Sequence, residues 1–144
     1  MIDLSNFCSK MGYTFTDSDR KSCLPLIEKI DSYAIEASKK GLLAMEEMSQ
    51  TEDNKFLRVA LELVMSAAKA DTIADILMAT IIADKPTGAE LLNKLIVIQA
   101  TMCFTDTDEY TYTIEPSKPP LIKKMLYDMC MGIGEKVKFF VPHY

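Results

Sequence analysis

The side chains of this sequence that could perform covalent or metal chemistry are four cysteines and one histidine. They are Cys8, Cys23, Cys103, Cys130 and His143, and the histidine lies next to the C-terminus. No Cys-x-x-Cys pair occurs, so a zinc site would require residues distant in sequence to converge. Three of the cysteines lie among apolar residues, which is typical of buried, reduced thiols in a cytosolic protein. We therefore expect neither a metal ion nor a cofactor.

Acidic residues form the second group with chemical potential. Glu46 and Glu47 precede Glu52 and Asp53 at the predicted end of a helix. A di-metal helical bundle would add Glu-x-x-His motifs that face inward, and this sequence has none. Residues 106–109 could bind a cation weakly, but a solvated loop is far more common. Phosphate-binding, nucleophile-elbow and zinc-protease motifs are also missing, so the sequence predicts no enzyme.

Composition restricts the classes of partner. The chain has 144 residues, of which 49% are hydrophobic and 26% charged, and its net charge is -5. These values predict a single globular domain over residues 1–144. The negative charge disfavours binding to nucleic acid or to an anionic membrane. The N-terminal residues lack a secretory signal pattern, and no apolar run reaches the ~20 residues of a membrane span, so we expect a soluble, cytoplasmic protein.

The apolar spacing predicts the elements that must position these residues. Apolar side chains recur every third or fourth residue, which indicates a mainly α fold, a bundle of about five helices. The predicted helices cover residues 17–49, 54–68, about 71–82, 87–104 and 121–137. Pro25 either lies early in the first helix or marks its true start, and Gly132 and Gly134 could end the last helix early. The predicted N-caps are Asp17, then Asp53 or Asn54, then Asp71.

Glycine and proline mark two special positions. Gly41 lies inside the first predicted helix, where glycine costs about 1 kcal/mol relative to alanine, so we expect close approach of another helix there. Pro86 predicts a break between the third and fourth helices.

Tyr110 and Tyr112 belong to a β-like pattern over residues 109–114, with 138–141 or a second subunit as the pairing strand. These tyrosines could form a recognition surface, but packing onto the bundle is the favoured interpretation.

One segment resembles a known family. Residues 37–82 contain Lys39 and Lys40, then Gly41-Leu42-Leu43-Ala44-Met45-Glu46, a polar turn, Phe56-Leu57 and an apolar helix, and then an Asp-led helix. This order resembles the cytoplasmic helical region of MotA-type flagellar stator proteins and covers about a third of the chain.

The resemblance implies a protein partner. In that family a basic side chain before the glycine and the Glu after it meet the rotor switch protein by charge complementarity, and Glu46 matches this Glu. Ser38 stands where the family often has Arg, so Lys39 and Lys40 would have to replace a planar guanidinium. The family's membrane helices have no counterpart here, so the resemblance does not extend to ion-driven stator function.

The leading hypothesis is therefore a noncatalytic cytoplasmic module that binds a protein, a flagellar rotor or switch component by resemblance. Its predicted partner-binding residues are Lys39, Lys40, Glu46 and Glu47. One alternative is a bundle that binds a small ligand or lipid in a pocket lined by Met78, Ile82, Leu95 and Met102. A weaker alternative is an enzyme that uses Cys103. A homo-oligomer is a further expectation, because the third predicted helix is apolar on more than one side.

Overall fold

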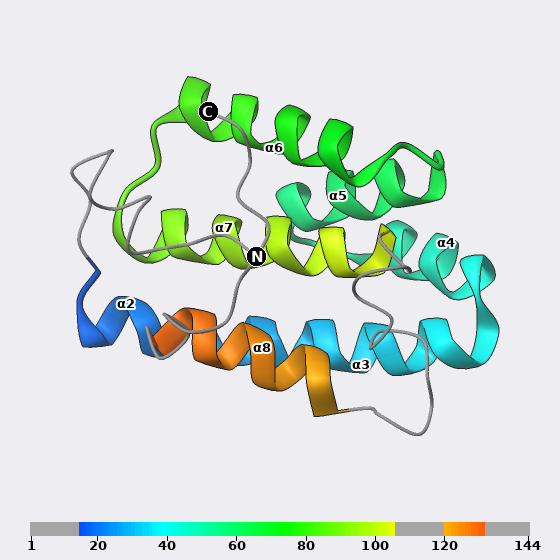
Figure 1. The fold of residues 1–144 in the computed structure, drawn as a ribbon, viewed down its shortest axis with the longest axis horizontal. Helices are drawn as coiled ribbons and strands as arrows, with labels where there is room; N and C mark the ends of the chain where they lie inside the picture. The colour runs from blue at the N-terminus through cyan, green and yellow to red at the C-terminus, as the bar shows by residue number, and fades with distance from the viewer. Residues whose placement is uncertain (1–14, 106–119, 132–144) are drawn as a thin grey trace.

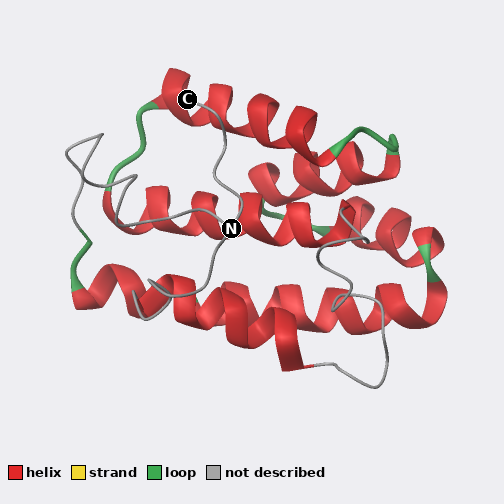
Figure 2. Cartoon of the chain, in the orientation of Figure 1, coloured by secondary structure: helices red, strands yellow, loops and turns green. Residues whose placement is uncertain are grey.

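The computed structural model describes residues 15–105 and 120–131, and this part of the chain contains helices and no strands (Figure 2). The helices are α2 (Asp17–Lys21), α3 (Leu24–Lys40), α4 (Leu42–Thr51), α5 (Lys55–Met65), α6 (Ala70–Asp84), α7 (Gly88–Thr105) and α8 (Pro120–Met131). The predicted helical bundle is confirmed. The predicted strands at 109–114 and 138–141, and the predicted end of the last helix, lie outside the described residues.

Helix α7 is the central element of the bundle. It packs against α2, α3, α5, α6 and α8. In Figure 1 it runs between α6 on one side and the pair α3 and α8 on the other. Its residues are buried almost without interruption from Leu91 to Phe104, and the buried set includes the polar Gln99 and Thr101. A helix buried all round forms a core, and each large apolar side chain there contributes about 1.5–3 kcal/mol by burial.

The first predicted helix, residues 17–49, is wrong as a single element, because α2, α3 and α4 divide this stretch. Helix α2 ends at Lys21, and Pro25 lies in the first turn of α3, where its missing N–H costs nothing. Gly41 then separates α3 from α4 with φ 66° and ψ -144°. That backbone conformation is incompatible with a continuous helix, so the chain turns there.

Two predicted caps are also wrong. Thr16, and not Asp17, caps α2, and it exchanges hydrogen bonds with Asp19 in a capping box. Lys69 occupies the N-cap position of α6, so Asp71 lies in the first turn, where a carboxylate still favours the helix dipole. The cap of α5 is Asn54, one of the two predicted residues, and its side chain accepts a hydrogen bond from Leu57 N–H.

The other predicted boundaries agree more closely with the structure. The chain breaks between α6 and α7 around Pro86, as predicted, and Lys85 ends α6 in the left-handed conformation. Helix α5 ends at Met65, three residues earlier than predicted, and Ala67 follows with φ 60°. Helix α8 begins at Pro120, one of the two prolines predicted to fit its first turn.

Candidate functional site

The predicted partner-binding residues lie on both sides of the turn at Gly41. Lys39 and Lys40 are the last residues of α3, and Glu46 and Glu47 lie on α4. All four side chains are exposed. Lys40 forms an ion pair of 3.7 Å with Glu36, one turn earlier on α3, so the structure pairs it within its own helix.

The backbone conformation at position 41, and not the close approach of a neighbouring atom, favours glycine there. A Cβ built on Gly41 would meet no atom within 4 Å, so the predicted close approach of another helix is wrong. Its positive φ, with ψ of -144°, belongs to a region that essentially only glycine adopts. The glycine therefore sets the direction in which α4 leaves α3.

Two exposed apolar side chains accompany these charges. Leu43 is 60% exposed, and Glu46 and Glu47 follow it by three and four residues on α4, which places them on the same face. Ile35 on α3 is also exposed, and Lys39 follows it by one turn. We use the name Gly41 corner for the residues Ile35, Lys39, Lys40, Leu43, Glu46 and Glu47.

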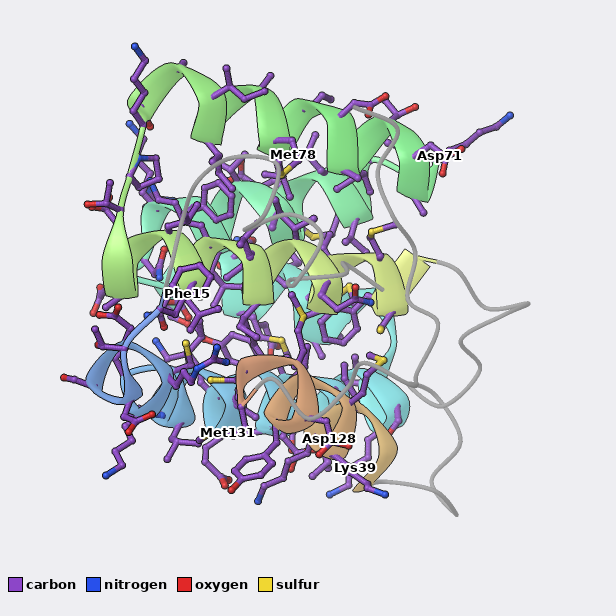
Figure 3. All side chains as sticks on the ribbon, turned by 60° about the vertical axis from the view of Figure 1, so that its left-hand side comes forward. Phe15, Lys39, Asp71, Met78, Asp128 and Met131 are labelled. Atoms are coloured by element: carbon purple, nitrogen blue, oxygen red, sulfur yellow. The ribbon has the colours of Figure 1, made fainter. Side chains whose placement is uncertain are left out.

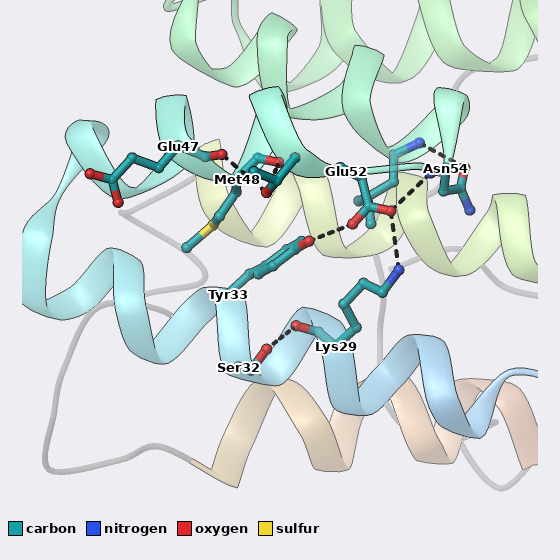
Figure 4. Close-up of polar contacts among 9 residues, drawn as sticks. Lys29, Ser32, Tyr33, Glu47, Met48, Glu52 and Asn54 are labelled. Atoms are coloured by element: carbon teal, nitrogen blue, oxygen red, sulfur yellow. Dashed lines mark hydrogen bonds and ion pairs between the residues drawn. The ribbon is translucent and has the colours of Figure 1, made fainter.

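The labelled side chains of the Gly41 corner point outward. Lys39 extends away from the ribbon in Figure 3. The Glu47 carboxylate points away from the polar cluster that joins α3 to α4 in Figure 4. Both groups are therefore available to an approaching molecule.

That polar cluster surrounds Glu52, a residue that the sequence suggested only as part of an acidic helix end. The Glu52 side chain is 1% exposed and accepts a hydrogen bond of 3.1 Å from Lys29 Nζ. The Tyr33 hydroxyl and the backbone N–H of Asn54 also donate to this carboxylate (Figure 4). The cluster ties α3 to the turn between α4 and α5. No pattern in the sequence indicates it, because its donors come from separate elements.

The hydrogen bonds of this cluster shift the pKa values of Glu52 and Tyr33 in opposite directions. Burial alone would raise the pKa of Glu52, but hydrogen bonds from Tyr33, Asn54 and Lys29 hold this pKa below its ordinary value of 4.5. Burial and the hydrogen bond to Glu52 raise the pKa of the Tyr33 phenol. Near neutral pH the carboxylate is therefore ionised and the phenol neutral, whereas a general base works best with a pKa near the operating pH.

The opposite side of α3 faces α8, and there the carboxylate of Asp31 has fewer hydrogen bonds, within the described part of the chain, than that of Glu52. Oδ1 of Asp31 is buried, and it has no hydrogen-bond partner among the described residues. Burial raises the pKa of Asp31, Lys123 opposes this change, and Glu28 adds to it. Lys123 on α8 forms an ion pair of 2.6 Å with Glu28, and this contact raises the pKa of Lys123.

The three cysteines within the described residues are buried, as predicted from their apolar surroundings. Cys103 lies on α7, where the Gln99 side-chain amide is 3.7 Å from its sulfur. Cys23 and Cys130 lie close together, although 107 positions separate them in the sequence, because their thiols donate to the consecutive carbonyl oxygens of Asp19 and Arg20. Sequence spacing cannot reveal such a pair, because only the packing of α8 on α3 brings it together.

The described part of the chain offers no metal centre: over residues 15–105 and 120–131, no group of three or more His, Cys, Asp or Glu could hold an ion. Cys8 and His143 lie outside the described residues. Residues 106–109, Tyr110 and Tyr112 also lie outside them, and their predicted roles stay predictions.

The residues proposed to line a ligand pocket do not all face the interior. Met78 on α6 and Leu95 and Met102 on α7 are buried. Ile82 is instead 52% exposed on α6, together with Ile76. An enclosed pocket would therefore have to form without Ile82.

Within the described residues, no helix combines the length and the apolar character needed to cross a membrane. Comparison with protein-family models, with curated proteins and with solved structures found no match to this chain. The resemblance to MotA-type proteins therefore depends on the residues of segment 37–82 alone.

Proposed function

We propose that this protein is a noncatalytic helical module of the cytoplasm, and that it binds another protein through the Gly41 corner. The observation that carries the proposal is the arrangement of charge around one exposed leucine. Two lysines precede Gly41, two glutamates follow it, and Leu43 between them is 60% exposed.

Opposite charges at separate places on a surface favour one orientation of a partner over others. Such patterns increase association rates and select partners more than they add affinity. An exposed apolar residue among them supplies area that binding removes from water. The Gly41 corner combines both features within a short stretch of chain.

A rigid support for this surface comes from the rest of the bundle. Helix α3 contributes Leu26, Ile27, Ile30 and Ala34 to the core, and α4 contributes Ala44, Met45 and Met48. The Glu52 cluster then ties α3 to the end of α4. A surface held on packed helices loses little conformational freedom when it binds.

The resemblance to MotA-type proteins suggests the class of partner. In that family the glutamate that corresponds to Glu46 contacts the rotor switch protein, so a flagellar rotor component is the proposed partner. The proposal takes over only this protein-binding role. Lys39 and Lys40 are the basic residues available for it, in the place of the family's arginine.

The test is recovery of the partner by affinity-tagged protein in the native host. Three variants alter the surface: Lys39→Glu with Lys40→Glu, Glu46→Lys with Glu47→Lys, and Leu43→Asp. We expect each to reduce recovery of a rotor component by about fivefold or more, since paired charges at interfaces each contribute on the order of 1 kcal/mol or more.

A matched control reverses two exposed charges elsewhere, Glu62 on α5 and Lys69 before α6. Recovery by Glu62→Lys with Lys69→Glu should equal that of the unaltered protein. Equal recovery by all variants would contradict the proposal. Hydrogen exchange of each variant confirms that the bundle is intact.

A further inference from the structure

A second feature of the molecule is independent of the Gly41 corner and lies at the other end of α3. Cys23 immediately precedes α3, and Cys130 lies near the end of α8. Both side chains are 0% exposed. Helix α8 packs against α3 and α7, so this contact joins its end to the start of α3.

Helix α2 brings the two sulfurs together. The Cys130 thiol donates to the carbonyl oxygen of Arg20 at 2.8 Å, and the Cys23 thiol points to the carbonyl oxygen of Asp19 at 3.7 Å. These two carbonyl groups are consecutive in the chain. The Arg20 guanidinium also donates to the Cys130 carbonyl oxygen at 2.6 Å, which holds the end of α8 in place.

The two thiols are chemically unequal. The neighbouring Cys23 thiol and the charge of Arg20 lower the pKa of Cys130, although burial opposes this change. The neighbouring Cys130 thiol and burial raise the pKa of Cys23. A thiol with a lowered pKa beside a second thiol matches a peroxide-sensing cysteine and its resolving partner in chemistry, but sensing cysteines are also accessible to solvent, and these two thiols are buried.

We propose that Cys23 and Cys130 form a reversible disulfide when the protein meets a peroxide, and that this bond locks α8 onto α2 and α3. The geometry that supports the proposal is the convergence of two buried thiols on adjacent carbonyl groups of one short helix. Local opening of α8 admits the oxidant, because buried groups are reached through such opening.

The reaction balances with hydrogen peroxide as the oxidant. The Cys130 thiolate attacks one peroxide oxygen, the S–O bond forms, the O–O bond breaks, and the departing hydroxide takes up a proton as water. The Cys23 sulfur then attacks the sulfenic sulfur of Cys130 as the Cys23 thiol proton passes to the departing hydroxyl group. The S–S bond forms, the S–O bond breaks, and a second water leaves with the Cys23 proton. The two thiols together lose two electrons, and the peroxide gains them.

The experiment uses the full chain, reduced with dithiothreitol, freed of reductant and then treated with hydrogen peroxide. We expect free thiols to fall from four to two. The intact mass should fall by about 2 Da, as for loss of two hydrogens on disulfide formation. Peptide mapping without reduction should link the peptides of Cys23 and Cys130, and dithiothreitol should reverse the change.

Melting supplies an independent measurement. A disulfide that closes a loop of about 100 residues raises the midpoint of thermal unfolding by about 10 °C. We expect this rise in the oxidised wild type and in Cys103→Ser, and not in Cys23→Ser or Cys130→Ser. If a Cys23 or Cys130 variant fails to fold, the peptide map of the wild type still decides the matter.

Three results would overturn the proposal. The first is a disulfide that involves Cys8 or Cys103 in place of the predicted pair. The second is oxidation of Cys130 to a sulfinic acid without a crosslink. The third is retention of all four thiols by the folded protein under conditions that oxidise the free thiol of a reference peptide. None of these results bears on partner binding at the Gly41 corner.

Discussion

Two carboxylates with buried oxygens lie on opposite flanks of helix α3, and they differ in how many hydrogen-bond donors they have. Toward α4 and α5, Glu52 has three hydrogen-bond donors, from Lys29, Tyr33 and the Asn54 backbone. Toward α8, Oδ1 of Asp31 is buried, and no described group donates to it. The pKa of Glu52 is accordingly lowered, and the pKa of Asp31 is raised.

The difference shows what a buried carboxylate requires. Burial disfavours the ionised form in both places, and only converging donors reverse that effect. The hydrogen bonds of Glu52 therefore join α3 firmly to the end of α4, and this contact supports the Gly41 corner. The α8 flank relies on apolar packing and on the exposed Lys123–Glu28 pair. A covalent bond between Cys23 and Cys130 would strengthen this second flank.

The largest expected effect follows from removing the Glu52 carboxylate. Glu52→Ala leaves the Tyr33 hydroxyl and the Asn54 N–H without their acceptor, so we expect a loss of about 3 kcal/mol in the free energy of unfolding. Glu52→Gln keeps an acceptor and should lose about 1–2 kcal/mol. Urea denaturation measures both values. The control Glu47→Ala, on the exposed face of α4, the helix that ends just before Glu52, should change stability by less than about 0.5 kcal/mol. A similar loss in the control would break the contrast between buried and exposed glutamates.

The next largest effect is expected at Gly41, the turn between α3 and α4. Gly41→Ala should destabilise the protein by about 1–2 kcal/mol, because alanine pays for the positive φ even though its Cβ has open space. The neighbouring Lys40→Ala should be close to neutral, since it removes only a surface ion pair. Thermal melting of the two variants measures the difference. An unchanged midpoint in Gly41→Ala would show that the turn relaxes without cost.

The acid dependence of stability separates the two flanks by sign. Because the folded pKa of Glu52 is below 4.5, its stabilisation is complete above that pH and is lost as pH falls through the folded value. Because the folded pKa of Asp31 is above 3.8, its contribution to stability increases as pH falls from that raised value toward 3.8.

Unfolding curves over about pH 3 to 7, where carboxyl groups titrate, measure these slopes. Relative to the wild type, Glu52→Gln should lose less stability on acidification, and Asp31→Asn should lose more. Both variants need only be folded at neutral pH for the comparison. Parallel curves for the two variants would contradict the assignment of opposite pKa directions.

The smallest effect is expected at the solvent edge of the α8 flank. Lys123→Ala removes the contact with Glu28, but both side chains are largely exposed, at 44% and 63%. Exposed pairs of this kind contribute little, so the denaturation midpoint should not change measurably. A clear loss would show that this ion pair, and not apolar packing, holds α8 on α3.

Some features of the fold could be predicted from local patterns. The apolar spacing of α5 and α8, the cap at Asn54 and the break at Pro86 depend on neighbours within one or two turns. The division at Gly41 was not predicted, because the apolar spacing of residues 17–49 continues through Gly41 without interruption. The periodicity of apolar residues indicates which face of a helix is buried, but it does not reveal the backbone angles of a single glycine.

The candidate site likewise has a part that local patterns predicted and a part that they did not. Exposure of Lys39, Lys40, Glu46 and Glu47 agrees with their polar character, and the predicted partner role remains a proposal. The Glu52 cluster and the Cys23–Cys130 pair were not predicted. Their members come from different helices, and the chain contains no motif that would connect them.

By itself, the sequence determined that the described residues form helices that bury apolar side chains, because the helical recurrence of those side chains can be recognised within each segment. Only the tertiary structure decided that α7 lies at the centre, that Glu52 is solvated by three donors, and that two distant thiols meet beside α2. Those outcomes depend on which helices pack together, and packing is a property of the whole chain.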